Sequence, residues 1–84
     1  MAVARKLKKV LEERFPAPDK VQLRDDDGII GIVTSRRFRG MDSMKRQDLF
    51  HDLLSSRFTE DEQRHILLIV GVTPEEELAN SVDE

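Results

Sequence analysis

The sequence predicts an α+β domain in which helices cover a three-stranded mixed sheet, with the element order α-β-β-α-β-α. Apolar residues recur at helical spacing in residues 2–15 and 43–57. Residues 20–35 place two strand-like stretches around an Asp-Gly turn, and the apolar run 65–72 leads into a strong helix start. Because a helix connects the second and third strands, we expect them to be parallel, with the first strand antiparallel to the second.

The first helix is predicted over residues 2–15, where Val3, Leu7, Val10 and Leu11 form one apolar stripe before Pro16. Residues 20–35 form the hairpin, and the Asp-Gly pair at its turn suits a bend with positive φ angles. The second strand is so apolar that we expect it to be central and buried on both faces.

A basic connector, residues 36–41, precedes a helix over residues 43–57 that Asp42 or Ser43 can cap. Residues 59–62 are either a polar break or one further helical turn. After the third strand, residues 73–76 (TPEE) have the pattern of a capping box with proline in the first turn. The tail, residues 80–84, is expected to be frayed.

The length of 84 residues indicates a single domain over residues 1–84, with a core at about 3–78 and a short disordered C-terminal tail. The absence of cysteine excludes a disulfide framework, a cysteine zinc site and a thiol nucleophile, so the cytoplasm is the expected compartment. The longest apolar run, residues 66–70, is too short to span a bilayer, and the first residues lack an apolar signal core. We therefore expect neither membrane association nor secretion.

The charges are distributed unevenly along the chain. Residues 1–46 carry 12 basic and 7 acidic side chains, whereas residues 47–84 carry 2 basic and 10 acidic. If the two halves occupy different faces, the molecule is bipolar. A basic half can attract nucleic acid or an acidic protein surface, and an acidic half can dock a basic partner.

Two histidines and one basic cluster are the candidate functional residues. His65 begins the third strand, where its imidazole would lie at the rim of the sheet as a metal or cluster ligand, or as a strand-end side chain bonded to the backbone. His51 lies beside the inward stripe of the second long helix and has no partner histidine at zinc-site spacing. The densest basic cluster precedes and enters this helix and comprises Arg36, Arg37, Arg39, Lys45 and Arg46.

That basic cluster is either a contact surface for a partner or a phosphate, or a solvated connector. With Phe38 as the one aromatic residue among these cations, stacking on single-stranded bases is poorly supported. The chain contains no G-x-S-x-G, Walker loop or serine–histidine–aspartate arrangement in a recognisable context, so no enzymatic activity is predicted.

Two motifs around the second helix resemble those of the BolA-like family. Residues 34–40 (TSRRFRG) resemble its strand-end pattern of Ser, two residues, Phe, one residue and Gly. Residues 45–49 (KRQDL) resemble its Q-R-H-x-L helix start, in which Arg46 and Leu49 match and Gln47 replaces histidine.

Two further motifs follow in the same order. Residues 64–69 (RHILLI) look like the family's I-H-A-L-x-I strand, and residues 73–76 are similar to its closing T-P-x-E. The resemblance covers residues 3–78, and it implies a KH-like fold of class II without a functional G-x-x-G loop.

The resemblance also implies a function. BolA-like proteins associate with monothiol glutaredoxins, often around a shared [2Fe–2S] cluster, and the strand-three histidine that ligates it corresponds to His65. The family's second ligand is a His or Cys in the loop between strands one and two, but this loop has aspartates at 25–27, so the second ligand is missing. The leading hypothesis is therefore a non-enzymatic adaptor that binds a glutaredoxin-type partner and modulates iron–sulfur trafficking or iron and stress regulation. The alternative is a nucleic-acid-binding transcriptional regulator that contacts DNA through Arg36, Arg37, Arg39, Lys45 and Arg46.

Overall fold

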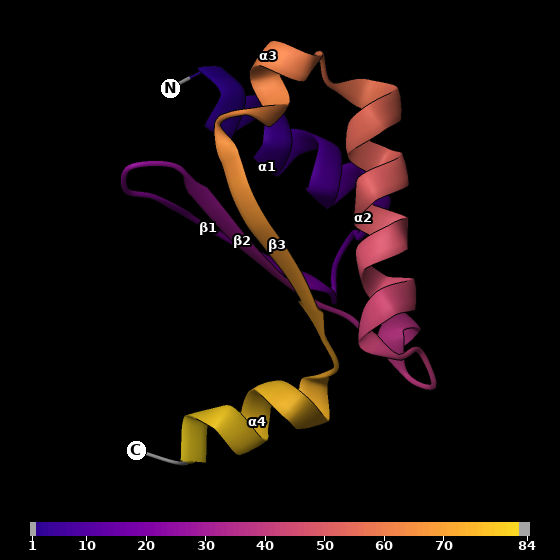
Figure 1. Ribbon diagram of the computed structural model, residues 1–84. Coiled ribbons are helices and arrows are strands. Elements are labelled where there is room, and N and C mark those ends of the chain that lie inside the picture. Colours follow the sequence, from indigo (N-terminus) through magenta and orange to yellow (C-terminus); the bar gives the residue numbers. More distant parts are fainter. Residues whose placement is uncertain (1, 83–84) are drawn as a thin grey trace.

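The computed structural model describes the backbone of residues 2–82 and the side chains of residues 2–78, and it confirms the predicted order of the main elements. It adds a 3-10 turn, η1, in the basic connector. Of the two alternatives for the polar segment after α2, it has the further helical turn, the short helix α3. The elements are α1 (Ala2–Arg14), β1 (Lys20–Asp25), β2 (Ile29–Thr34), η1 (Arg36–Phe38), α2 (Ser43–Arg57), α3 (Glu60–Gln63), β3 (Ile66–Val72) and α4 (Pro74–Val82) (Figure 1).

The sheet has the predicted topology, with the strand order β1-β2-β3, β1 antiparallel to β2, and β3 parallel to β2. Asp27 and Gly28 in the hairpin turn have φ angles of 57° and 129°. These positive values match the Asp-Gly pattern, because aspartate tolerates the left-handed region and glycine enters it without steric cost.

The core lies between one face of the sheet and the two long helices. Three phenylalanines from α1's end, η1 and α2 meet there: Phe15, Phe38 and Phe50 have ring centroids 5.5–6.0 Å apart. Phe38 was predicted only as part of a connector, yet it is fully buried. Its ring packs against β3 at Gly71, where a Cβ atom would lie 2.8 Å from the ring. Glycine is therefore required at this position for close packing.

The opposite face of the sheet differs from the prediction. Side chains alternate along β2, so that Ile29 and Val33 point into the core while Ile30 and Ile32 are 36% and 39% exposed. The strand is central, as expected, but it is not buried on both faces. Within residues 2–82, α1 and α2 pack on one face only, and α4 runs away from them at the lower end of the sheet (Figure 1).

Helix α4 begins with the predicted capping box. The Thr73 backbone N–H donates to the Glu76 carboxylate at 2.8 Å, and the Glu76 N–H donates to the Thr73 hydroxyl at 3.1 Å. The helix continues through Val82, so residues 80–82 of the expected frayed tail lie within α4, while residues 83–84 lie outside the described residues. No helix among residues 2–82 is long and apolar enough to cross a bilayer.

The predicted separation of charge is also altered by folding. Four ion pairs join cations of the first half of the chain to glutamates of the second half: Lys6–Glu62, Lys20–Glu77, Arg39–Glu75 and Arg46–Glu76. Opposite charges that are distant in sequence therefore lie side by side, and the basic and acidic halves are not segregated at these positions.

Candidate functional site

His65 lies where the chain leaves α3 and enters β3. Its backbone N–H donates to the Glu62 carbonyl at 3.1 Å, and its carbonyl accepts from the Ile29 N–H at 2.8 Å. These two bonds tie the residue to α3 and to the first residue of β2. The backbone of His65 is thus held in place while its side chain is exposed at the predicted rim of the sheet.

A hollow of about 460 Å³ lies beside this histidine. The β1–β2 hairpin forms its other wall, because the parallel pairing of Ile29 with Ile66 places the start of β3 next to the turn. The lining residues are Asp25, Asp27, Gly28, Arg64, His65 and Leu67. His65 is a residue that the sequence predicts for the site, whereas Arg64 is not, and the aspartates were predicted as turn residues.

The imidazole of His65 has no hydrogen-bond or ion-pair partner among the described side chains and backbone groups. The alternative prediction that this ring bonds to the backbone is therefore wrong. Arg64, which also lines the hollow, forms an exposed ion pair with Asp61 at 3.5 Å. A nitrogen atom of the His65 ring is therefore available as a ligand or hydrogen-bonding group for a bound molecule.

The donor set around the hollow does not make a complete metal site. Within the part of the chain that the structure describes, no group of three or more His, Asp or Glu side chains is placed to hold a metal ion. Asp25 and Asp27 offer hard oxygen atoms, whereas iron–sulfur clusters take thiolate or imidazole ligands. The residues around the hollow therefore do not supply two ligands for an iron–sulfur cluster. They are compatible with one ligand from this chain, the imidazole of His65.

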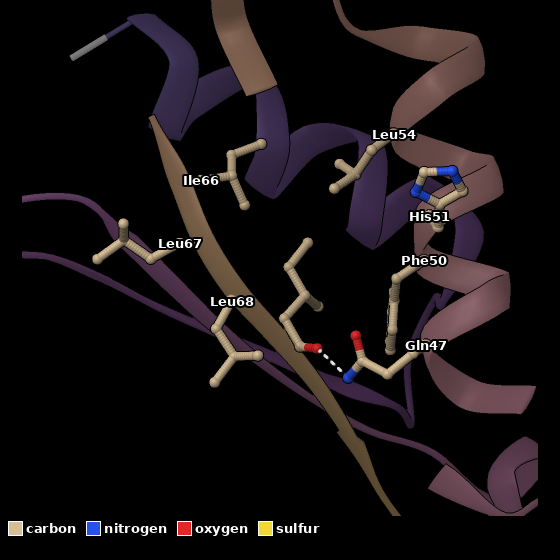
Figure 2. A pocket seen from close by; sticks show the side chains of 8 residues that line it. Gln47, Phe50, His51, Leu54, Ile66, Leu67 and Leu68 are labelled. Atoms are coloured by element: carbon tan, nitrogen blue, oxygen red, sulfur yellow. Dashed lines mark hydrogen bonds between the residues drawn. The ribbon is translucent and has the colours of Figure 1, made fainter. Parts of the chain in front are cut away.

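His51 lies away from this hollow, on α2. It borders a smaller groove of about 150 Å³ between α2 and β3, where the Gln47 side chain donates from Nε2 to the Ile69 carbonyl at 3.0 Å (Figure 2). Gln47 thus occupies part of the free edge of β3. The structure keeps the two histidines on separate elements and lining separate hollows.

Arg46 of the predicted basic cluster is an internal clamp. Its guanidinium donates to three main-chain carbonyls, those of Phe38 (2.9 Å), Met41 (2.9 Å) and Gly71 (3.0 Å). It also bonds Glu76 at 2.7 Å, and this hydrogen bond is the main reason that the pKa of Glu76 lies below its ordinary value. The side chain is only 15% exposed, so Arg46 holds η1, β3 and α4 together.

The remaining cations of the cluster have different surroundings. Arg39 forms a two-bond ion pair with Glu75, and this contact is the largest cause of the lowered pKa of that carboxyl. Arg37 donates to the Arg14 carbonyl at 3.0 Å, at the end of α1. Arg36 and Lys45 are exposed, and neither side chain has a partner within residues 2–78. The five predicted residues therefore do not form one free cationic surface.

No protein-family model, curated protein sequence or solved structure matches this chain. The resemblance to BolA-like proteins thus stays a prediction, carried by the four motifs and compatible with the coarse α+β class of the fold.

Proposed function

We propose that this chain is a non-enzymatic, BolA-like adaptor that docks a monothiol glutaredoxin-type partner at the hollow beside His65. The observation that supports the proposal most directly is an exposed imidazole, which has no partner among the described residues, on a backbone held by two hydrogen bonds. A ring held in this way can meet a partner without first breaking an internal contact.

The cofactor in this proposal is a [2Fe–2S] cluster held largely by the partner. The chain contains no cysteine, so His65 would contribute one nitrogen ligand, and thiolates of the partner would supply the others. The role proposed for the complex is to modulate iron–sulfur trafficking or iron and stress regulation.

The test is co-expression with a monothiol glutaredoxin, followed by size-exclusion chromatography with visible absorbance. We expect a coloured complex whose spectrum is lost or shifted in His65→Ala. His65→Cys, which retains a ligating atom, should give a different spectrum that still belongs to a bound cluster.

His51→Ala is the matched control, because it removes the other exposed histidine from a different hollow. It should leave the complex and its spectrum unchanged. Failure to form a complex, or identical spectra for His65→Ala and the wild type, refutes the proposal.

Nucleic-acid binding is the second candidate, and the exposed cations Arg36 and Lys45, which have no carboxylate partner among the described side chains, favour it. Binding of a DNA duplex should weaken steeply with salt and should fall in Arg36→Ala/Lys45→Ala. Binding that is absent at low ionic strength refutes this second function.

A further inference from the structure

The open face of the sheet carries an apolar surface that the proposed function does not use. Paired residues of adjacent strands share a face, and they form two rows across the sheet. We call this surface the open-face patch, and its rows are Arg24–Ile30–Leu68 and Gln22–Ile32–Val70.

The apolar side chains of the open-face patch are accessible. Ile30, Ile32 and Leu68 are 36%, 39% and 47% exposed, although all three lie in the interior of their strands. On the β1 side, a hollow of about 310 Å³ is lined by Gln22, Leu23, Arg24, Ile30 and Ile32. An exposed apolar group of this kind, rimmed by polar side chains, is typical of a binding surface.

The patch has defined limits. At the lower end of the face, the next row is occupied by α4, where Glu77 accepts from Thr34 at 2.6 Å and pairs with Lys20 at 3.4 Å. At the free edge of β3, the Ile69 and Gly71 carbonyls already accept from Gln47 and Arg46. On the β3 side, the face is therefore more open to a partner than the edge.

The dimensions of the patch suit one helix. The outer strands of a three-stranded sheet lie about 10 Å apart, which is close to the diameter of a helix with its side chains. The two open rows lie two residues apart along each strand, a separation of roughly 7 Å, which is a little more than one helical turn. A footprint of this size is far below the roughly 800 Å² per partner that a stable dimer needs, so a homodimer through this patch alone is disfavoured.

The charge of Arg24 indicates which kind of partner helix the open-face patch suits. Arg24 ends one row, is exposed, and has no carboxylate partner in the described part of the chain. On the same face of a second copy, the Glu77 carboxylate is already engaged with Thr34 and Lys20. The complementary partner presents apolar side chains beside a carboxylate.

We propose that the open-face patch binds an amphipathic helix of a partner protein, with its apolar stripe on Ile30, Ile32 and Leu68 and an acidic residue of its flank against Arg24. This inference goes beyond the proposed adaptor function and depends on neither His65 nor a cluster.

The test uses two synthetic 14-residue helical peptides with the same leucine stripe, flanked by glutamate in one and by lysine in the other. Binding to the full chain is followed by fluorescence anisotropy and by amide chemical shifts. We expect the glutamate peptide to bind about fivefold more tightly than the lysine peptide, with shifts centred on the open-face patch. Arg24→Glu should reverse that preference.

A second variant tests the apolar contact. Ile30→Thr/Leu68→Thr should weaken the binding of the glutamate peptide by about tenfold. Met44→Thr is the matched control, because Met44 is 74% exposed but lies on α2, and it should leave binding unchanged. His65→Ala should also bind the peptide normally, which separates this test from that of the adaptor function. If the double variant does not fold, the reversal in Arg24→Glu decides alone.

Three outcomes overturn the proposal. They are equal binding of the two peptides, shifts that lie outside the patch, and concentration-dependent shifts at the patch without peptide. The last outcome, together with a dimer in analytical ultracentrifugation, would assign the face to a second copy of the chain.

Discussion

Replacement of Arg46 by alanine is expected to be among the most damaging single changes outside the apolar core. One guanidinium bonds the carbonyls of Phe38, Met41 and Gly71, which come from two segments, the connector 36–41 and β3. Its plane also lies 5.7 Å from the centroid of the Phe38 ring. Alanine would remove all three bonds: the Met41 and Gly71 carbonyls would lose the donor, whereas the Phe38 carbonyl would keep its bond from the Met41 N–H at 3.1 Å. It would also remove the cation that joins α2 to α4.

The magnitude follows from these three bonds. A hydrogen bond from a charged donor contributes about 1.5–3 kcal/mol when it is buried. Because Arg46 is 15% exposed, water can replace part of each bond, and we take about 1 kcal/mol for each carbonyl. Arg46→Ala should therefore lower the free energy of unfolding by about 3 kcal/mol, out of roughly 4–13 kcal/mol for a domain of this length.

The assay is urea denaturation followed by far-UV circular dichroism. Arg46→Lys should lose about half as much, because an ammonium keeps the charge but cannot reach three carbonyls in the planar geometry of a guanidinium. Arg36→Ala is the control, since Arg36 is an exposed neighbour in sequence and should change stability by no more than about 0.5 kcal/mol. A loss below 1 kcal/mol in Arg46→Ala would refute the clamp.

Three further predictions concern the end of the sheet and α4. The carboxyls at 75–77 have pKa values lowered by hydrogen bonds, chiefly from Arg39, Arg46 and Thr34 respectively. The stabilisation that these hydrogen bonds give the fold is present above pH 4.5, the ordinary carboxyl pKa, and it is lost as the pH falls through the lower pKa values of the folded state. The urea concentration at the midpoint of unfolding should therefore decrease as the pH is lowered below 4.5, and a flat profile contradicts this. Gly71→Ala should cost about 1–3 kcal/mol in thermal melts because its Cβ would overlap the Phe38 ring, and an unchanged melt would show that the ring can move. Thr73→Ala should cost about 1 kcal/mol and lower the helicity of α4 by circular dichroism, whereas full helicity would show that the capping box is dispensable.

Local patterns were sufficient to predict most elements. The apolar stripe of α1, the Asp-Gly turn and the capping box at Thr73 each depend on residues within a few positions of one another. The order of strands followed from the lengths of their connections, which allow a hairpin between β1 and β2 and require a crossover between β2 and β3. The position of His65 at the rim followed in turn from its place at the start of β3.

Contacts between distant segments were not predictable in this way. Arg46 looks like a surface cation in the sequence, and only the fold brings its side chain to Gly71, 25 positions away. Phe38 similarly looks like part of a polar connector until Gly71 provides space for its ring.

The positions of helices and strands, and the apolar faces that they carry, follow from the residue order, because these properties arise from short-range spacing and capping. Which apolar face is covered and which cation is free depends on how these elements pack together. Ile30 and Ile32 stay exposed because α1 and α2 pack on the other side of β2, and the acidic residues of α4 engage Arg39 and Arg46. Burial and ion pairing depend on neighbours that the fold supplies, so neither could be assigned from composition or periodicity alone.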